Sequence, residues 1–254
     1  MNSKKQTLPF LLAFFILFAL LTGLGFLAMN IDWTWDRILI CLVIVSGATI
    51  AWSLIMRTPL ARSFRKVGFG VPSWRAIGVA VVLSAGMLVF FPLYSKLASV
   101  KLPLQDNWLW ILVGTITGVG IAEETLFRGY AFNFLQEKRT FWKAATLSMI
   151  LFGAMHLLLL LWLPMPIAIA AIILAIIAAY PTAYLFEIGS LTIWPSAILH
   201  TTALAPNLFE IPAESVVSLS LLWIGVLIIF SFLVFAAGRL VFQINPATQI
   251  SHSE

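Results

Sequence analysis

Charged residues are scarce in this sequence. Of its 254 residues, 10% are Asp, Glu, Lys or Arg and 61% are hydrophobic, and the mean hydropathy is +1.03. Soluble domains carry about 25% charged residues, so the composition excludes a water-soluble globular protein. The apolar residues gather in runs that are long enough to cross a bilayer. We therefore predict an all-α, polytopic membrane protein whose partner on most sides is the lipid bilayer.

Cysteine and histidine are also rare. The single cysteine, Cys41, excludes a disulfide framework and a metal site built on several thiolates. Of the three histidines, His252 lies in the polar tail 243–254, which we expect to be disordered, whereas His156 and His200 lie inside apolar runs. The formal net charge of +5 comes mostly from basic residues at the ends of these runs. That pattern is typical of membrane topology, so no nucleic-acid partner is expected.

The apolar runs predict about eight transmembrane helices in a single integral membrane domain, residues 1–254. Most Lys and Arg residues fall in connectors that lie on one side if the N-terminus is inside, so we predict an N-in, C-in topology. The expected spans are 9–29, 38–56, 76–94, 108–136, 143–163, 167–186, 191–205 and 219–242.

Three charged residues interrupt the fourth run: Glu123, Glu124 and Arg128. A charge in the hydrocarbon region costs roughly 2.5 to 3.5 kcal/mol even on the lenient insertion scale. On an α-helix, Glu124 and Arg128 are one turn apart and can form an ion pair, while Glu123 points about 100° away. We expect Glu124 and Arg128 to hold each other and Glu123 to face another element. A purely structural clamp would explain the same residues.

The two histidines within apolar runs lie at depths similar to that of Glu123. Counted from the cytoplasmic helix ends, Glu123 and His156 lie about 20 Å deep and His200 about 14 Å deep. In one interpretation, Glu123 deprotonates a water held by His156, and His200 stabilises the oxyanion. In the other, all three side chains hold a divalent metal such as Zn²⁺. The spacing lacks the H-E-x-x-H signature, so we prefer the first interpretation, which needs no cofactor.

The polar motifs occur in order along three apolar runs: Glu123-Glu124-x-x-x-Arg128, Phe152-x-x-x-His156 and His200. They resemble the motifs of the CPBP family, the CAAX-prenyl-protease and bacteriocin-processing membrane proteases, also called Abi proteins. The resemblance covers about residues 108–207, the fourth to seventh spans, which would form a catalytic four-helix core. It implies an intramembrane endopeptidase that acts on a membrane-associated peptide or protein in the bacterial cytoplasmic membrane.

The same resemblance assigns roles to individual residues. Glu123 and His156 would activate water, and His200 would stabilise the oxyanion together with an Asn four residues further on. This sequence departs from the pattern, because Leu204 occupies that position. Asn207, two turns after His200, is the candidate replacement donor.

Two other classes of function remain open on the sequence alone. A non-catalytic CPBP-like membrane partner or a bacteriocin self-immunity protein would keep the polar core for packing. A proton-coupled transporter would use Glu and His as a proton relay, although the sequence shows no internal repeat. Prenylated CAAX peptides, bacteriocin leaders, peptide pheromones and membrane regulators are equally compatible with the sequence as substrates.

Overall fold

The computed structural model describes residues 4–27 and 33–242. Within these ranges every regular element is a helix, apart from an isolated bridge between Leu104 and Phe209, so the predicted all-α class is confirmed. In this part of the chain seven helical segments are long and apolar enough to cross a membrane, and the molecule is a polytopic membrane protein. The predicted polar tail 243–254, with His252, lies outside the described residues.

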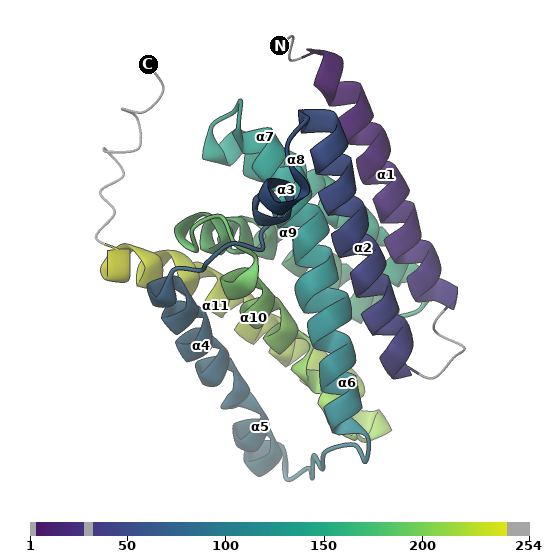
Figure 1. Ribbon diagram of the computed structural model, residues 1–254. Helices are drawn as coiled ribbons and strands as arrows, with labels where there is room; N and C mark the ends of the chain where they lie inside the picture. Colours follow the sequence, from purple (N-terminus) through teal and green to yellow (C-terminus); the bar gives the residue numbers. More distant parts are fainter. Residues whose placement is uncertain (1–3, 28–32, 243–254) are drawn as a thin grey trace.

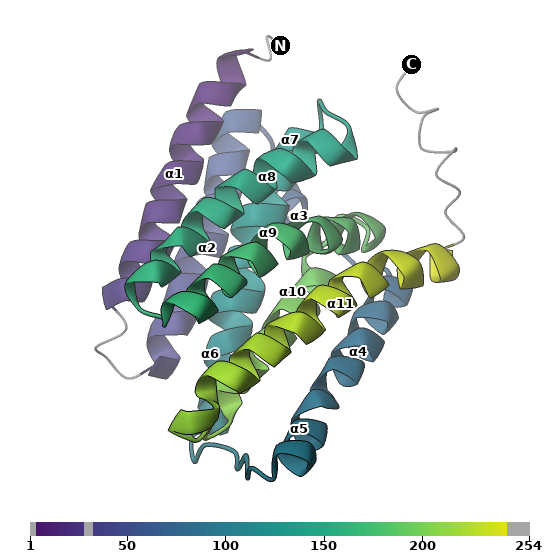
Figure 2. The same cartoon turned by 180° about the vertical axis from the view of Figure 1, so that it is seen from behind.

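The helices form a tilted bundle in which the fourth candidate span runs through the middle (Figure 1). The first two helices, α1 (Lys4–Leu27) and α2 (Trp33–Met56), pack against each other. From behind, α8, α9 and α11 cross the bundle as neighbouring diagonals (Figure 2). The elements after α2 are α3 (Leu60–Lys66), α4 (Trp74–Leu88), α5 (Phe90–Ala98), α6 (Trp108–Thr115), η2 (Ile116–Glu123), η3 (Thr125–Phe132), α7 (Asn133–Gln136), α8 (Phe141–His156), η4 (Leu157–Leu161), α9 (Met165–Ile188), α10 (Trp194–Ala203), η5 (Ala205–Leu208), η6 (Ala213–Ser215) and α11 (Val216–Phe242).

The predicted span 191–205 is a short helix. The helix α10 has ten residues and is therefore about 15 Å long, half of the roughly 30 Å hydrocarbon thickness. Pro195 stands in its first turn, where proline is tolerated, and Pro206 follows its end and cannot continue the helix. Of the about eight predicted spans, the other seven are long and apolar enough to cross a membrane within the described residues.

Residues 193–208, which include α10, are hydrogen-bonded to the loop before α4 and to the loop after α5. At the start of this segment, the backbone N–H of Ile193 donates to the carbonyl of Gly68, in the loop before α4. At its end, the N–H of Gln105, in the loop after α5, donates to the carbonyl of Leu208. Residues 193–208 therefore run alongside α4 and α5 in the same direction. The N-in, C-in orientation stays a prediction.

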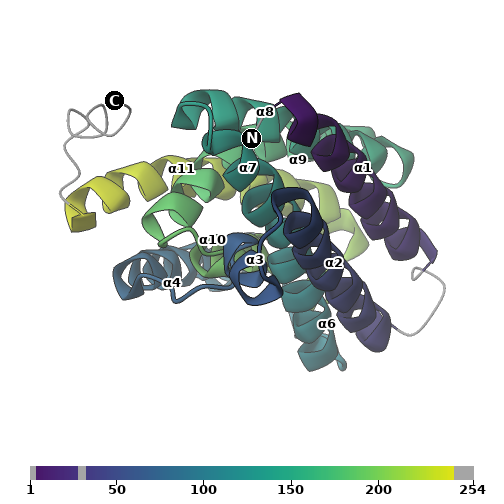
Figure 3. The same ribbon diagram turned by 45° about the horizontal axis from the view of Figure 1, so that its top comes forward.

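The fourth span is wider than an α-helix over much of its length. Residues Trp108–Gln136 are one continuous helical segment, but η2 and η3 are π-helical, with i→i+5 hydrogen bonds in place of i→i+4. Such turns are rare and occur frequently at functional sites. All residues of η3 are buried, and η2 contacts α2 on one side and α10 on the other (Figure 3). The charged stretch thus sits at the centre of the bundle.

Two glycines allow this central helix to approach its neighbours closely. A Cβ at Gly120 would collide with the hydroxyl of Thr201 on α10, and a Cβ at Gly129 would collide with the carbonyl of Val67, just after α3. Any larger residue at either position would push the helices apart. Gly120 therefore fixes the distance between the charged stretch and α10, which carries His200, and Gly129 fixes its distance to the end of α3.

Two apolar clusters flank the central helix. The first joins α1 and α2 to η3, α8 and α9, with Phe14, Phe127 and Phe152 among its buried members. The second joins α4 and α5 to α10 and α11, with Met87 and Trp223 among its buried members. The polar side chains of the central helix lie where these clusters meet.

Candidate active site

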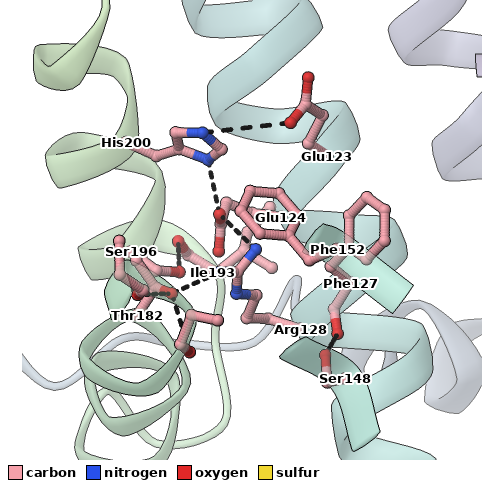
Figure 4. Close-up of polar contacts among 12 residues, drawn as sticks. Glu123, Glu124, Phe127, Arg128, Ser148, Phe152, Thr182, Ile193, Ser196 and His200 are labelled. Carbon is pink, nitrogen blue, oxygen red and sulfur yellow. Dashed lines mark hydrogen bonds and ion pairs between the residues drawn. The ribbon is translucent and has the colours of Figure 1, made fainter. Parts of the chain in front are cut away.

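Glu124 is the centre of a buried polar network. Its Oε1 atom accepts a hydrogen bond from Nδ1 of His200 at 2.7 Å and lies 3.1 Å from Nη1 of Arg128 (Figure 4). The side chains of Glu124 and Arg128 are 0% and 2% exposed. A buried ion pair is tolerated only with close geometry and further hydrogen bonds. The predicted pairing of Glu124 with Arg128 is present, and the bond to His200 was not foreseen.

Arg128 is held by two further groups from neighbouring helices. Its Nη2 donates to the hydroxyl of Thr182 on α9, and that hydroxyl donates in turn to the carbonyl of Ala178 at 2.7 Å. Its guanidinium carbon lies 4.5 Å from the ring centroid of Phe152 on α8, within cation–π range. Arg128 therefore ties the central helix to both α8 and α9.

Glu123 has a different environment from its neighbour Glu124. Its side chain is 17% exposed, and its Oε2 lies 4.0 Å from Nε2 of His200. The imidazole of His200 stands between the two glutamates and turns one nitrogen toward each (Figure 4). One carboxylate is thus engaged in the buried network, while the other remains beside open space.

His156 lies at the end of α8, and its ring is fixed by Phe152. Its Nδ1 is 2.9 Å from the carbonyl oxygen of Phe152, and the two ring centroids are 4.4 Å apart. A carbonyl can only accept, so Nδ1 carries the hydrogen, and in the neutral ring Nε2 keeps its lone pair. The Phe152 ring also meets the His200 ring edge-on at 5.8 Å. Phe152 packs between the two histidines.

A cavity of about 520 Å³ brings the three predicted residues together. Glu123 comes from η2, His156 from α8 and His200 from α10, and all three line its wall. The rest of the wall is mostly apolar and draws on both clusters described above. A carboxylate and two imidazoles therefore share one mostly apolar cavity.

Asn207 is not part of this wall. Its side chain is exposed on η5, and its carbonyl accepts a hydrogen bond from Nε2 of Gln105 at 2.8 Å. Because α10 ends at Ala203, the two-turn spacing from His200 does not continue along one helical face. Asn207 is thus placed away from His156 and Glu123, and of the two predicted alternatives, Asn207 as a second donor or His200 alone, the geometry favours His200 alone. Leu204 does line the cavity.

No group of three or more His, Cys, Asp or Glu residues within the described ranges is preassembled to hold a metal ion. The Nδ1 atoms of His200 and His156 are bound to Glu124 and to the carbonyl of Phe152, so the Nε2 atom of each ring is the one left for another partner. Histidines that bind metals commonly have their other ring nitrogen bound in this way. The interpretation with Zn²⁺ on Glu123, His156 and His200 stays a prediction.

Two residues of the site were missed by the sequence-based reasoning. Thr182 is a lone polar residue beside Pro181 in an otherwise apolar run, and its isolation was the available signal. Arg37 was assigned to an outer connector, whereas it lies in α2 and lines the cavity. The available sequence signal for Arg37 was the Asp36-Arg37 pair of charges directly before a long apolar run.

Fold and site together define a class: an all-α polytopic membrane protein whose central helix presents a glutamate, beside two histidines, to an apolar cavity. Residues 105–205 match the family model described as type II CAAX prenyl endopeptidase, Rce1-like. This part of the chain is similar to the Rce1-like proteins of the CPBP family, which confirms the resemblance drawn from the motifs. No curated protein matches the chain.

Proposed function

We propose that the protein is an intramembrane endopeptidase that hydrolyses peptide bonds of a membrane-associated peptide or protein. The observation that carries the proposal is the convergence of Glu123, His156 and His200 from three separate helices on one mostly apolar cavity. The Rce1-like match over residues 105–205 supports peptide hydrolysis as the reaction. We also propose the bacterial cytoplasmic membrane as its location.

Glu123 is the general base in the proposed reaction. It accepts a proton from a water molecule as the water oxygen attacks the carbonyl carbon of the scissile bond. Nε2 of His156, which carries the lone pair, accepts a hydrogen bond from the hydrogen that stays on that water and thereby orients it. When the tetrahedral intermediate collapses, the C–N bond breaks and Glu123 returns its proton to the leaving amine. The products are a carboxylic acid and an amine.

His200 is the electrophilic partner in the same scheme. Glu124 accepts the hydrogen of Nδ1, which fixes the orientation of the ring, much as a buried carboxylate orients histidine in a catalytic triad. The scheme requires the imidazolium form of His200, which donates from both ring nitrogens. Nε2 then faces the cavity beside Glu123 and donates to the oxyanion of the intermediate. Leu204, which lines the cavity four residues after His200, has no side-chain donor. Stabilisation of the oxyanion therefore depends on His200.

The experiment uses the purified full chain in detergent or in liposomes. Because the matching family model names CAAX prenyl endopeptidases, the first substrate is a farnesylated peptide with a CAAX end, alongside its unprenylated form and a hydrophobic peptide panel. We expect cleavage by the wild type and by Glu187→Gln, a control glutamate on α9 that is not part of the cavity wall. We expect Glu123→Gln to be slower by about 10²- to 10⁴-fold. Equal rates for Glu123→Gln and the wild type would refute the assignment.

A non-catalytic role is the second candidate, and one observation favours it. The position where the family carries an oxyanion-stabilising Asn holds Leu204, and Asn207 does not compensate. A non-catalytic membrane partner or self-immunity protein would use the buried network for packing only. It predicts that Glu123→Ala and His156→Ala lower the melting temperature but preserve the cellular phenotype, whereas the endopeptidase proposal predicts loss of that phenotype.

A further inference from the structure

Arg37 brings a positive charge into the cavity from outside the Rce1-like segment. It lies near the start of α2 and lines the same cavity as Glu123. Its side chain runs across Gly118 on η2, where an added Cβ would come within 2.9 Å of Cδ and 3.5 Å of Nη1. Gly118 and Glu123 are five residues apart, so the i→i+5 bonding of η2 places them about one turn apart. Arg37 therefore reaches the face of the helix that carries Glu123.

Arg37 is one of several charged or titratable residues around Glu123. Glu123 interacts electrostatically with His200, Glu124, Arg128 and Arg37. Arg128 and Nδ1 of His200 are both bound to Glu124. Arg37 is the cation that reaches Glu123 from α2, on the cavity side. Arg37 also interacts electrostatically with Asp36, on the same helix.

We propose that Arg37 is a positioning residue that holds the carboxylate of Glu123 in its orientation toward the cavity. An ionised carboxylate in a low-dielectric space is costly unless a cation lies nearby. A general base must also point at the reacting water, because a misplacement of about 1 Å can cost about 10²-fold in rate. Arg37 meets both needs without touching the substrate. The inference rests on the proposed function for its catalytic consequence, but the Arg37–Glu123 interaction can be tested separately.

The kinetic test changes Arg37 directly and also displaces it without changing its charge. We expect Arg37→Gln to lower kcat by about 10- to 100-fold with little change in KM, and Arg37→Lys to recover part of the loss. Gly118→Ala should lower kcat as well, because the new methyl group displaces the arginine, although alanine favours helix formation over glycine. Gly78→Ala on α4, where a Cβ meets nothing within 4 Å, is the matched control and should keep the wild-type kcat. Wild-type kcat in Arg37→Gln would overturn the proposal.

A second readout does not depend on activity. Melting temperatures are measured for Arg37→Gln, Glu123→Gln, the double variant and Asp36→Asn in the purified full chain. If Arg37 holds Glu123, Arg37→Gln shifts the melting temperature in the wild-type background and has little effect in the Glu123→Gln background. Additive shifts, or coupling of Arg37 to Asp36 alone, would overturn the pairing. Coupling to Glu123 in a protein that cleaves none of the peptides would refute the proposed function and leave the pairing intact.

Discussion

Two adjacent glutamates in one helix have opposite environments. Glu124 is fully buried, and a single carboxylate oxygen contacts both His200 and Arg128. Glu123 is partly exposed to the cavity, and its contact with His200 is longer, at 4.0 Å. A carboxylate with close, charge-assisted contacts is fixed in position, whereas a carboxylate beside open space can exchange a proton with water. The comparison supports the proposal that Glu124 has a structural role and that Glu123 is the general base.

The difference shows how a membrane protein can keep a reactive charge in its interior. The buried network of Glu124, Arg128 and Thr182 fixes the central helix relative to α9, and through His200 relative to α10. The central helix is therefore held by Glu124 and Arg128, and the carboxylate of Glu123 is not needed to hold it in place. Four variants or treatments can break or sharpen this comparison.

The largest effect on stability is expected for Glu124→Gln. It leaves Arg128 buried without its ion-pair partner, and breaking a buried pair costs about 3–5 kcal/mol. The free energy of unfolding of the detergent-purified protein measures the loss. The double variant Glu124→Gln/Arg128→Met removes both charges and should recover much of it. If Glu124→Gln were as stable as the wild type, Glu124 could not be the centre of the network.

A smaller loss is expected for Thr182→Val, which keeps the shape of the side chain but removes the hydroxyl that accepts from Arg128. A lost hydrogen bond to a charged group costs about 1.5–3 kcal/mol. Unfolding measurements on Thr182→Val and Thr182→Ser test this, since serine retains the hydroxyl. Wild-type stability in Thr182→Val, with a loss in Thr182→Ser, would show that the methyl group matters and the hydrogen bond does not.

Leu204→Asn is expected to raise activity. Leu204 lines the cavity four residues after His200, and a second donor there could share the oxyanion. Removal of one such donor costs other enzymes about 10²- to 10³-fold, so an added donor that is not yet optimally placed should give about a tenfold gain in kcat. Leu204→Ala controls for the change in volume. Equal rates for the Asn and Ala variants would argue against an oxyanion at this position.

Chelation is expected to have no effect on activity, because the proposed hydrolysis uses Glu123 as general base and needs no metal. Cleavage is measured before and after treatment with 1,10-phenanthroline and again after addition of Zn²⁺. Loss of cleavage on chelation, followed by recovery with Zn²⁺, would show that Glu123 and the histidines bind a metal in solution.

The sequence predicted the features that follow from composition and from the cost of buried charge. Long apolar runs identified the membrane-crossing helices, and the four-residue spacing identified the Glu124–Arg128 pair. The similar depths of Glu123, His156 and His200 predicted a shared location, and the three residues line one cavity.

Other features depend on tertiary contacts and could not be read from local patterns. Depth along a helix does not determine which carboxylate a ring nitrogen faces, so the bond from His200 to Glu124 was missed. The π-helical turns change the direction of each side chain relative to an α-helix. Hydropathy alone did not show that α10 ends at Ala203. Asn207 therefore lies on η5 and not on the same helix as His200.

The most direct test of the division of labour is to measure cleavage rate and melting temperature together for Glu123→Gln and Glu124→Gln. The account predicts that Glu123→Gln loses cleavage and keeps a melting temperature near that of the wild type, whereas Glu124→Gln unfolds at a clearly lower temperature. A Glu123→Gln protein that cleaves at the wild-type rate, or that loses as much stability as Glu124→Gln, would contradict it.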